Sequence, residues 1–352
     1  MLENVRLKEK LFMNDQKKLK VGIIGYGKVG KIRHKCVNAH PQLELVSVCD
    51  TNKDISSKDG VVFYSDYKEL LEKSPCDVVF VCTFNKFIPE IAIEAISRGI
   101  HVFSEKPPGR TLEDVQSIYK AAEQNKKVKV KFGFNHRYHE GVIEAKSIVD
   151  SKRFGEIMWI RGVYGKAGGP EYDKNWRNNK ELSGGGILID QGIHMIDLFR
   201  HFAGEYDEVK SFVGDSYWKV GVEDNVFALL RNSKTGKPAM IHSSATQWRH
   251  KFLLEIYMEK GYLEIDGILS STMTYGRETL KIARCIMDKN GYPMPNPQEN
   301  MTYYNDDNSW NDEIAEFVEC IVNDQDIVNG GVVDAVATMK LVEEIYNNDI
   351  KK

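Results

Sequence analysis

Residues 19 to 30 read Leu-Lys-Val-Gly-Ile-Ile-Gly-Tyr-Gly-Lys-Val-Gly, and this stretch decides the fold of the chain. A short run of strand-forming residues leads directly into the pattern G-x-G-x-x-G, and the residues from Lys28 to Ala39 can then form a helix. In a strand–turn–helix unit of this kind, Gly25 permits the tight turn and Gly27 lets a pyrophosphate approach the backbone. Gly30 allows the helix to pack closely on the strand, and the helix N-terminus faces the phosphates. The stretch therefore predicts a dinucleotide-binding unit.

A second run of strand-forming residues, Leu43 to Cys49, ends in Asp50, about 20 residues past the last glycine. An acidic residue at this place accepts hydrogen bonds from the adenosine ribose of NAD and would repel the 2′-phosphate of NADP. NAD is therefore the expected cofactor, with NADP less favoured. The alternative is a glycine-rich turn that binds no ligand, but strand, helix and acidic residue all stand in register. The residues expected to bind the cofactor here are Gly25, Tyr26, Gly27, Lys28, Val29, Gly30 and Asp50.

The composition is that of an ordinary soluble protein, with 352 residues, 42% of them hydrophobic, and a net charge of −3. This length suits two domains that each bury a core. The slightly negative charge argues against binding to nucleic acid, and no apolar run approaches the length of a membrane span. The six cysteines form no C-x-x-C pair, and the nine histidines form no metal-binding pattern. We expect a cytoplasmic protein with no metal, no nucleic-acid partner and no membrane partner.

Strand and helix patterns alternate through roughly the first 150 residues, which predicts a doubly wound parallel sheet. Ligands bind at the carboxyl ends of the strands in such sheets. Two of these ends carry Thr83-Phe-Asn85 and Glu105-Lys106-Pro107. We expect Thr83, Asn85, Glu105 and Lys106 to contact the cofactor, although a bare turn is the alternative for Thr83 and Asn85. The expected strands are 20–24, 43–49, 77–82, 100–104 and 128–132, and the expected helices are 28–39, 66–73, 86–98 and 111–125.

The pattern changes after about residue 150, where successive short strands indicate a mostly antiparallel sheet. The segment 286–307, which contains three prolines, is expected to be irregular. A helix led by three glycines is expected from residue 184. The other expected helices are 138–151, 308–322 and 331–348, and the expected strands are 156–164, 208–214, 224–231, 238–247, 252–258, 261–265 and 279–284.

A lysine, an aspartate and a histidine are available to act on one substrate hydroxyl. Lys106 lies in a turn that two following prolines make rigid. Asp190 and His194 lie four residues apart, and hence on one face of the expected helix. A histidine can take a hydroxyl proton near neutral pH, and an ammonium can stabilise the alkoxide as hydride leaves the carbon. The plainer alternatives are a surface lysine, a first-turn acid and a core histidine. Asp197 could orient the imidazole or pair with Arg200.

Charged and aromatic residues near these positions could contact the substrate. Aromatic faces stack on sugar rings, and arginine grips carboxylate or phosphate groups. The local cations, which include Lys180, favour an anionic substrate such as a sugar phosphate, a uronate or a nucleotide sugar over a neutral polyol. The alternative is a solvated, partly packed loop. The candidates are Arg137, Tyr138, Lys166, Trp176 and Arg177, together with Asp190 and His194.

Five blocks in this order resemble the Gfo/Idh/MocA (glucose–fructose oxidoreductase, inositol dehydrogenase and MocA) oxidoreductases. The resemblance implies an N-terminal Rossmann domain and a C-terminal α/β domain whose large open sheet commonly mediates dimers or tetramers. It places the family's catalytic lysine, aspartate and histidine at Lys106, Asp190 and His194. The chain departs from many members at Lys86-Phe-Ile-Pro89, which lacks a histidine and leaves the contacts of that helix open. The blocks are residues 21–30, Val81-Cys-Thr-Phe-Asn85, Ser104-Glu-Lys-Pro-Pro-Gly109, Gly133-Phe-Asn-His-Arg-Tyr138 and Gly184-Gly-Gly-Ile-Leu-Ile-Asp-Gln-Gly-Ile-His-Met-Ile-Asp197.

The expected fold is α/β, with a Rossmann doubly wound parallel sheet followed by an α/β domain with a large open, mostly antiparallel sheet. The expected parts are an N-terminal extension (1–18), the NAD-binding domain (19–135), a substrate-binding and oligomerisation domain (136–330) and a C-terminal helix (331–352). We interpret the chain as an NAD(H)-dependent oxidoreductase, a homodimer or homotetramer, that converts a sugar CH–OH to a ketone or the reverse in carbohydrate biosynthesis. The alternatives are an NAD-retaining glycosidase, a sugar–sugar oxidoreductase, and a ligand-sensing Rossmann regulator without chemistry.

Overall fold

The computed structural model describes residues 18–52, 60–270 and 272–350 of the chain. The expected N-terminal extension lies almost entirely outside these described residues. No helix within these ranges is long and apolar enough to cross a membrane. The chain divides into two compact units: unit 1 comprises Met1–Pro108, Glu113–Gly133 and Trp310–Val332, and unit 2 comprises Gly109–Leu112, Phe134–Ser309 and Val333–Lys352. The domain boundaries expected from the sequence assign residues 310–330 to the second domain, but in the structure these residues belong to unit 1.

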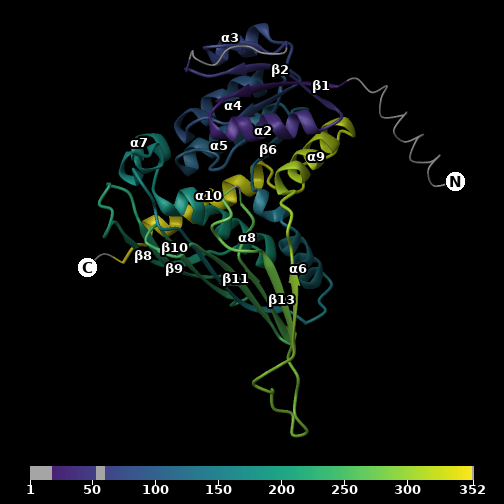
Figure 1. Cartoon of the computed structure of the whole chain (residues 1–352), viewed down its shortest axis with the longest axis vertical. Coiled ribbons are helices and arrows are strands. Elements are labelled where there is room, and N and C mark those ends of the chain that lie inside the picture. The colour runs from purple at the N-terminus through teal and green to yellow at the C-terminus, as the bar shows by residue number, and fades with distance from the viewer. Residues whose placement is uncertain (1–17, 53–59, 271, 351–352) are drawn as a thin grey trace, which may run out of the picture. The chain divides into compact units, whose positions relative to one another are not determined.

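Unit 1 contains a six-stranded parallel sheet with the order β3-β2-β1-β4-β5-β6 (Figure 1). All four residues of β4 are buried, as in a parallel strand that is covered on both faces. The strand order reverses between β1 and β4, and ligands bind at such a switch point. The doubly wound sheet is therefore confirmed. The strands are β1 (Leu19–Ile24), β2 (Leu43–Cys49), β3 (Val62–Tyr64), β4 (Val78–Val81), β5 (His101–Ser104) and β6 (Val130–Phe132), and the helices are α2 (Lys28–Ala39), α3 (Tyr67–Lys73), α4 (Ile88–Ser97), α5 (Leu112–Gln124) and α9 (Ser309–Val322).

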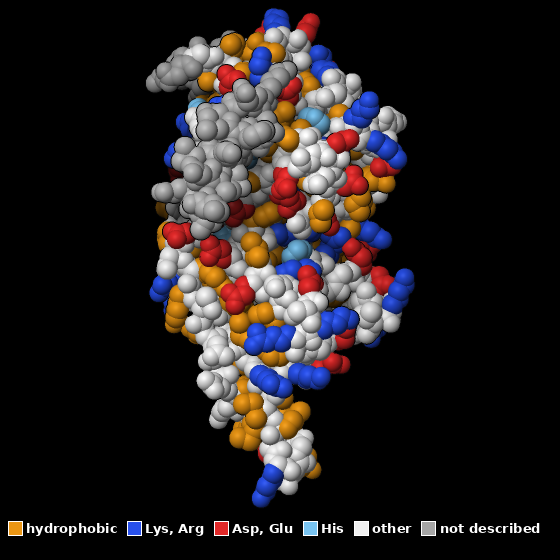
Figure 2. Space-filling model, turned by 90° about the vertical axis from the view of Figure 1, so that its right-hand side faces the viewer, with side chains coloured by type: hydrophobic (Ala, Val, Ile, Leu, Met, Phe, Trp, Pro, Cys, Tyr) orange, Lys and Arg blue, Asp and Glu red, His pale blue; other side chains and the backbone are white. Residues whose placement is uncertain are grey.

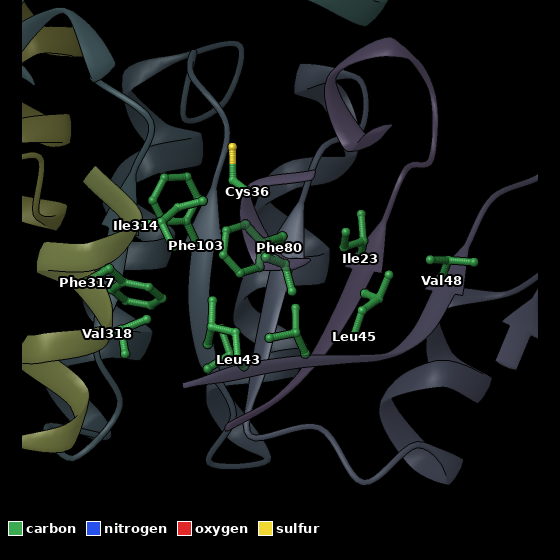
Figure 3. Close-up of a cluster of buried hydrophobic side chains, with 13 residues drawn as sticks. Ile23, Cys36, Leu43, Leu45, Val48, Phe80, Phe103, Ile314, Phe317 and Val318 are labelled. Carbon is green, nitrogen blue, oxygen red and sulfur yellow. The ribbon is translucent and has the colours of Figure 1, made fainter. Parts of the chain in front are cut away.

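The core of unit 1 joins this sheet to a helix from the far end of the chain (Figure 3). Phe80 and Phe103, on neighbouring strands, stack with their ring centroids 4.9 Å apart. Phe317 of α9 meets the ring of Phe103 edge-on at 5.6 Å. Ile314 and Val318 of α9 are buried in the same cluster. These apolar residues of α9 recur every three or four positions and form one face, which explains why the helix belongs to unit 1.

Unit 2 contains an eight-stranded sheet with the order β14-β13-β12-β11-β7-β10-β9-β8, in which only the pair β7 and β10 is parallel. Buried and exposed residues alternate along β9, so one face of the sheet is covered and the other is open. Phe212, Phe227 and Leu229 are exposed. The mostly antiparallel sheet is confirmed. Its strands are β7 (Ile157–Gly165), β8 (Glu208–Gly214), β9 (Asn225–Arg231), β10 (Pro238–Ser244), β11 (Lys251–Met258), β12 (Gly261–Asp266), β13 (Thr279–Arg284) and β14 (Glu299–Tyr303), and the helices are α6 (Glu140–Asp150), α7 (Lys180–Ser183), α8 (Ile193–Ala203) and α10 (Val332–Asn347).

The segment that we expected to be irregular contains the edge strand β14, which pairs with β13. Every residue of β14 is exposed. A strand with no buried face does not need alternating apolar residues, so its sequence does not show the pattern that predicts a half-buried strand. The residues between β13 and β14 extend away from the sheet as an arm (Figure 1). Hydrophobic side chains gather on this arm (Figure 2). The exposed apolar residues of the arm are Ile286, Met287, Tyr292 and Met294.

Candidate active site

The glycine-rich loop of unit 1 has the geometry that dinucleotide binding needs. Gly25 has a φ of +88°, and a Cβ there would lie 2.5 Å from the carbonyl oxygen of Cys82. A Cβ on Gly30 would lie 2.1 Å from the carbonyl oxygen of Gly25, so glycine is required for α2 to pack this close to the turn. A Cβ on Gly27, the residue before α2, would meet nothing within 4 Å. Two glycines therefore close the turn, and the third borders open space at a helix N-terminus, where a pyrophosphate fits.

Asp50 is held beside this loop by two backbone groups. Its Oδ2 accepts the N–H of Tyr26 at 2.7 Å, and its Oδ1 accepts the N–H of Asn52 at 2.9 Å. Each carboxylate oxygen keeps a lone pair for a ribose hydroxyl. The hydroxyl of Tyr26 hydrogen-bonds His34 Nδ1 of α2. The side chain of Tyr26 is thus turned toward α2, while its backbone orients Asp50.

The other predicted cofactor contacts follow β4 and β5. Asn85 is buried and opens a 3₁₀ turn, Asn85–Phe87. Thr83 and Lys106 are half-buried. These residues, like the glycine-rich loop and Asp50, stand at carboxyl ends of strands of the unit 1 sheet. Lys106 therefore belongs to unit 1, whereas the predicted aspartate and histidine belong to unit 2.

Glu105, the residue before Lys106, is held by a buried arginine. Arg33 of α2 is completely buried, and its Nε donates to Glu105 Oε1 at 2.6 Å. Its Nη2 forms a second ion pair of 2.6 Å with Glu313 of α9. The guanidinium carbon lies 4.5 and 4.3 Å from the centroids of two aromatic rings, one from β5 and one from α9. Burial raises the pKa of Glu313 to about 7, against the opposing effect of Arg33.

The start of the helix led by three glycines is held by Glu223. The backbone N–H groups of Gly186 and Leu188 donate to its carboxylate at 2.8 and 3.0 Å, and the hydroxyl of Tyr346 donates at 2.8 Å. A Cβ on Gly186 would lie 2.1 Å from the carbonyl oxygen of Glu223. Burial raises the pKa of this carboxyl. The close approach of Glu223 therefore accounts for a glycine at this turn.

Asp190 lies in a π-helical turn, Leu188–Gly192, which precedes α8. The sequence predicts a regular helix here, so the structure corrects the expected register between Asp190 and His194. Gly192, at the end of this turn, allows close packing on β10, because a Cβ there would lie 2.9 Å from the Oγ of Ser243. A π-turn is common at functional sites.

Asp190 forms ion pairs with two of the predicted substrate-binding residues. Lys166 Nζ donates to Oδ2 at 2.8 Å, and Arg177 Nε donates to Oδ1 at 3.1 Å. The Arg177 guanidinium also lies 4.5 Å from the centroid of the Trp176 ring. The structure thus brings four predicted residues together. Two cations therefore share the carboxylate of Asp190.

His194 is buried and stacks on a second histidine. The ring centroids of His194 and His136 are 3.7 Å apart, with 14° between the ring planes. His136 Nδ1 lies 3.1 Å from Asn135 Oδ1, and His136 Nε2 lies 3.1 Å from the hydroxyl of Tyr164. Because the amide nitrogen of Asn135 donates to Ser309 Oγ at 3.0 Å, the amide oxygen faces His136. Because the amide oxygen of Asn135 can only accept, His136 carries a proton on Nδ1, and its Nε2 shares a hydrogen bond with the hydroxyl of Tyr164.

Arg137, a predicted substrate contact, lies in a buried ion-pair network. Its Nε and Nη2 donate to Asp197 at 2.8 and 2.7 Å, and its Nη1 donates to Asp334 at 2.9 Å. Asp197 is thus bound to Arg137 rather than to the imidazole or to Arg200, the partners considered from the sequence. The geometry favours a structural role for Arg137. The neighbouring Tyr138 is also buried.

Three residues that position the predicted set were not identified from the sequence. His136 lies in the block Gly133–Tyr138, which resembles the family, so its position in that block could have indicated a role in the site. Tyr164 and Glu223 gave no such signal, because they come from other segments of the chain. Among the described residues, no group of three or more His, Cys, Asp or Glu side chains could hold a metal ion.

Comparison with known proteins gives two family matches that together follow both units. Residues 19–134 match the oxidoreductase family with an NAD-binding Rossmann fold, and residues 142–264 match the GFO/IDH/MocA C-terminal domain. A D-glucoside 3-dehydrogenase of Escherichia coli K12 is 34% identical over 212 residues, 58% of this chain and 59% of that protein. An inositol 2-dehydrogenase of Salmonella typhimurium LT2 is 31% identical over 166 residues, 44% of this chain and 48% of that protein. The chain thus spans about half the length of the curated relatives it matches.

Solved structures show the same fold over nearly the whole chain. A levoglucosan dehydrogenase in complex with NADH and levoglucosan has a TM-score of 0.83 at 20% identity, covering 94% of this chain and 97% of that chain. A myo-inositol 2-dehydrogenase from Lactobacillus plantarum has a TM-score of 0.77 at 22% identity, with the same two coverages. The resemblance seen in the sequence is confirmed: the chain belongs to the GFO/IDH/MocA family of oxidoreductases, and its first unit has that family's NAD-binding Rossmann fold.

Proposed function

We propose that this protein is an NAD-dependent dehydrogenase that oxidises a CH–OH group of a sugar or sugar derivative to a ketone, or catalyses the reverse reduction. The observation that carries the proposal is the arrangement around α8, where a buried imidazole and an ion-paired aspartate lie on neighbouring turns of one helical segment. The NAD-binding loop supports it, because Gly27 borders open space and Asp50 offers carboxylate oxygens beside that loop. Bound NAD would supply the hydride acceptor.

The proposal gives each polar residue one task on the substrate hydroxyl. His194 takes the hydroxyl proton during oxidation and returns it during reduction. Lys106 stabilises the negative charge that develops on the oxygen. Asp190 orients the substrate, and its ion pairs with Lys166 and Arg177 hold its carboxylate in place. A fixed carboxylate of this kind pre-organises the site.

The more specific part of the proposal is an anionic sugar substrate, namely a phosphorylated, uronate or nucleotide-linked sugar used in carbohydrate biosynthesis. The two cations beside Asp190, Lys166 and Arg177, support it. The names of the relatives point to neutral sugars and polyols, so the test must separate the two classes. With an anionic substrate, KM should rise between low and high salt, and Arg177→Ala should raise it further. Efficient turnover of neutral inositol or hexose, with no effect of salt or of Arg177→Ala, would exclude the anionic class.

The activity is tested by NADH formation from NAD against free, phosphorylated and nucleotide-linked sugars. Steady NADH formation with at least one sugar supports the dehydrogenase. Product formation without net NADH would instead identify an enzyme that retains NAD, such as a glycosidase or a sugar–sugar oxidoreductase. Sugar binding with no product in either direction would identify a ligand-sensing regulator.

The same proposal includes a homodimer or homotetramer formed through the open face of the unit 2 sheet. That face exposes Phe212, Phe227 and Leu229, which are 59%, 49% and 60% exposed. Apolar groups gathered on an open sheet mark an interaction surface. A two-fold axis would pair this face with itself. Light scattering at micromolar concentration should give two or four times the chain mass, and a monomer would contradict this part.

Location in the cytoplasm also belongs to the proposal. All six cysteines are free thiols in the structure. Free thiols are typical of a reducing compartment, where structural disulfides are rare. Fractionation of the cells that make the protein, with the enzyme found in a membrane or exported fraction, would contradict it.

A further inference from the structure

Two aromatic side chains of unit 2 are unusually open to solvent for their size. Tyr217 is 58% exposed and Trp248 is 62% exposed. Their ring centroids are 5.0 Å apart, and the ring planes meet at 71°. A core role does not explain them, because a packed aromatic residue buries most of its surface. The pair, which we call the aromatic platform, presents two apolar faces to solvent.

The platform is held in place by a buried carboxylate. Asp224 is fully buried and accepts three consecutive backbone N–H groups, those of Ser216, Tyr217 and Trp218, at 3.2, 2.7 and 2.9 Å. These hydrogen bonds lower the pKa of Asp224 although burial raises it. The indole of Trp218 donates to the carbonyl oxygen of Ala245 at 2.9 Å. The loop that carries Tyr217 is therefore tied to the end of β10, just before Trp248.

A continuous set of contacts leads from the platform to the Asp190 cluster. Tyr217 meets Trp218 at 5.2 Å between ring centroids, and Trp218 meets Tyr172 at 4.6 Å. The ammonium of Lys166 lies 5.8 Å from the centroid of the Tyr172 ring. The same Lys166 donates to Asp190 Oδ2 at 2.8 Å. Contacts between neighbouring side chains thus connect the aromatic platform with Asp190, the residue that we propose orients the substrate.

The backbone gives a second, shorter connection. The N–H of Gln247, the residue before Trp248, donates to the carbonyl oxygen of Lys166 at 3.0 Å. The N–H of Lys166 donates to the carbonyl oxygen of Ser244 at 2.8 Å. The segment that bears Trp248 is therefore bound directly to the segment that bears Lys166. Trp248 thus directly follows a residue whose backbone is bound to the backbone of Lys166, the residue that pairs with Asp190.

We propose that Tyr217 and Trp248 bind a second sugar ring, joined by a glycosidic bond to the sugar that the Asp190 and His194 site oxidises. This proposal rests on the dehydrogenase of the proposed function and not on the charge of its substrate, and it specifies the substrate as a glycoside or oligosaccharide rather than a single sugar. The C–H faces of a pyranose are apolar and stack on aromatic rings, while its hydroxyls stay in water. Half-exposed aromatic rings suit such a ligand, because they leave the hydroxyl edge of the sugar hydrated.

The test compares substrates of one and two rings with the protein loaded with NAD. The probes are glucose against cellobiose, maltose and sucrose, with UDP-glucose as an arm for a nucleotide in place of the second sugar. In Trp248→Ala, the ratio of kcat/KM for the preferred disaccharide to kcat/KM for glucose should fall about tenfold, as expected for the loss of one aromatic stacking contact. Tyr217→Ala should lower the same ratio. Tyr292→Ala is the matched control, since Tyr292 is 69% exposed but lies on the arm.

Binding is measured separately by calorimetry with NADH present, so that the platform and the oxidation step are tested apart. Disaccharide binding that is weaker in Trp248→Ala than in the wild type supports the platform. If no sugar is oxidised in the same experiments, the proposed dehydrogenase activity is contradicted while the platform is not. Turnover in which the ratio is the same in wild type and Trp248→Ala overturns the platform and leaves the dehydrogenase standing. A dependence on Trp248 seen with UDP-glucose but with no disaccharide overturns the second sugar. A change of mass by light scattering in Trp248→Ala overturns the platform as well, because it assigns Trp248 to a subunit contact.

Discussion

Glu313→Gln should make the protein more stable at and above neutral pH, with a much smaller gain near pH 5. Glu313 lies in the buried group that Arg33 forms with Glu105, between the rings of Phe103 and Trp310. One guanidinium faces two carboxyl groups there. The other cation that acts on Glu313, Lys131, is paired with Glu316, so full ionisation of the group leaves an excess of negative charge in a dry site. Burial raises the pKa of Glu313 from 4.5 to about 7. Glutamine keeps the shape of the protonated acid and leaves the pair of Arg33 and Glu105 intact.

The size and sign of the effect follow from linkage. An unfolded chain releases the Glu313 proton above pH 4.5, whereas the folded protein keeps it until about pH 7. The folded state binds more protons in this window, so stability falls as pH rises from about 4.5 to about 7 and the loss stays constant above it. The shift corresponds to about 3 kcal/mol. The variant cannot lose a proton, so its stability should exceed that of the wild type by up to about 3 kcal/mol at pH 8.

Urea unfolding followed by circular dichroism at pH 5, 6, 7 and 8 measures this difference. Glu319→Gln is the matched control, because Glu319 is an exposed acid on the same helix. That control should track the wild type within about 0.5 kcal/mol at each pH. Parallel curves for Glu313→Gln and wild type from pH 5 to 8 would refute the reasoning. A less stable variant at pH 8 would also refute it, since the ion pair with Arg33 would then outweigh the burial of the charge.

Three further predictions concern the cofactor, the chemistry and the fold. Lys106→Ala and His194→Ala should each lower kcat by at least roughly a hundredfold with little change in NAD affinity, measured by initial rates and calorimetry; near-normal turnover of His194→Ala from pH 6 to 9 would remove the base assignment. NAD should bind more tightly than NADP, and Asp50→Ala should narrow the difference in affinity, because the carboxylate of Asp50 would repel a 2′-phosphate; equal binding of NADPH by the wild type would contradict this. Arg137→Met should destabilise the protein by roughly 3–5 kcal/mol, because it leaves Asp197 buried without its partner; thermal unfolding measures this, and a stable Arg137→Met with impaired sugar binding would restore the substrate role.

The sequence predicted those parts of the fold that depend on local patterns. The roles of Gly25, Gly27 and Gly30 could be stated in advance, because each follows from what a strand–turn–helix unit allows at that position. The alternating strands of the sheet in unit 2 were predicted for the same reason, as β9 shows with its regular burial pattern. By contrast, β14 gave no signal, because no residue of an exposed edge strand needs to be apolar. The short strand β3 was missed too, since three residues carry too little pattern.

Long-range pairing was the part that the sequence could not supply. From the sequence, Arg137 was a candidate for substrate contact, with a solvated, partly packed loop as the alternative. The structure gives Asp197 and Asp334, which come from two different helices. Likewise, the domain boundaries expected from the sequence placed α9 in the second domain, whereas its apolar face packs in the core of unit 1. Only three-dimensional contacts decide such choices, because several partners satisfy the same local chemistry.

The contacts around α8 favour a division of labour between Asp190 and His194. Asp190 accepts hydrogen bonds from two cations, which fix the position of its carboxylate and suit it to orienting a substrate. His194 has a different kind of neighbour, because its ring stacks on the ring of His136. His136 is in turn held by Asn135 and Tyr164. The stack fixes the plane of the imidazole, which is the arrangement that the proposed proton transfer by His194 requires.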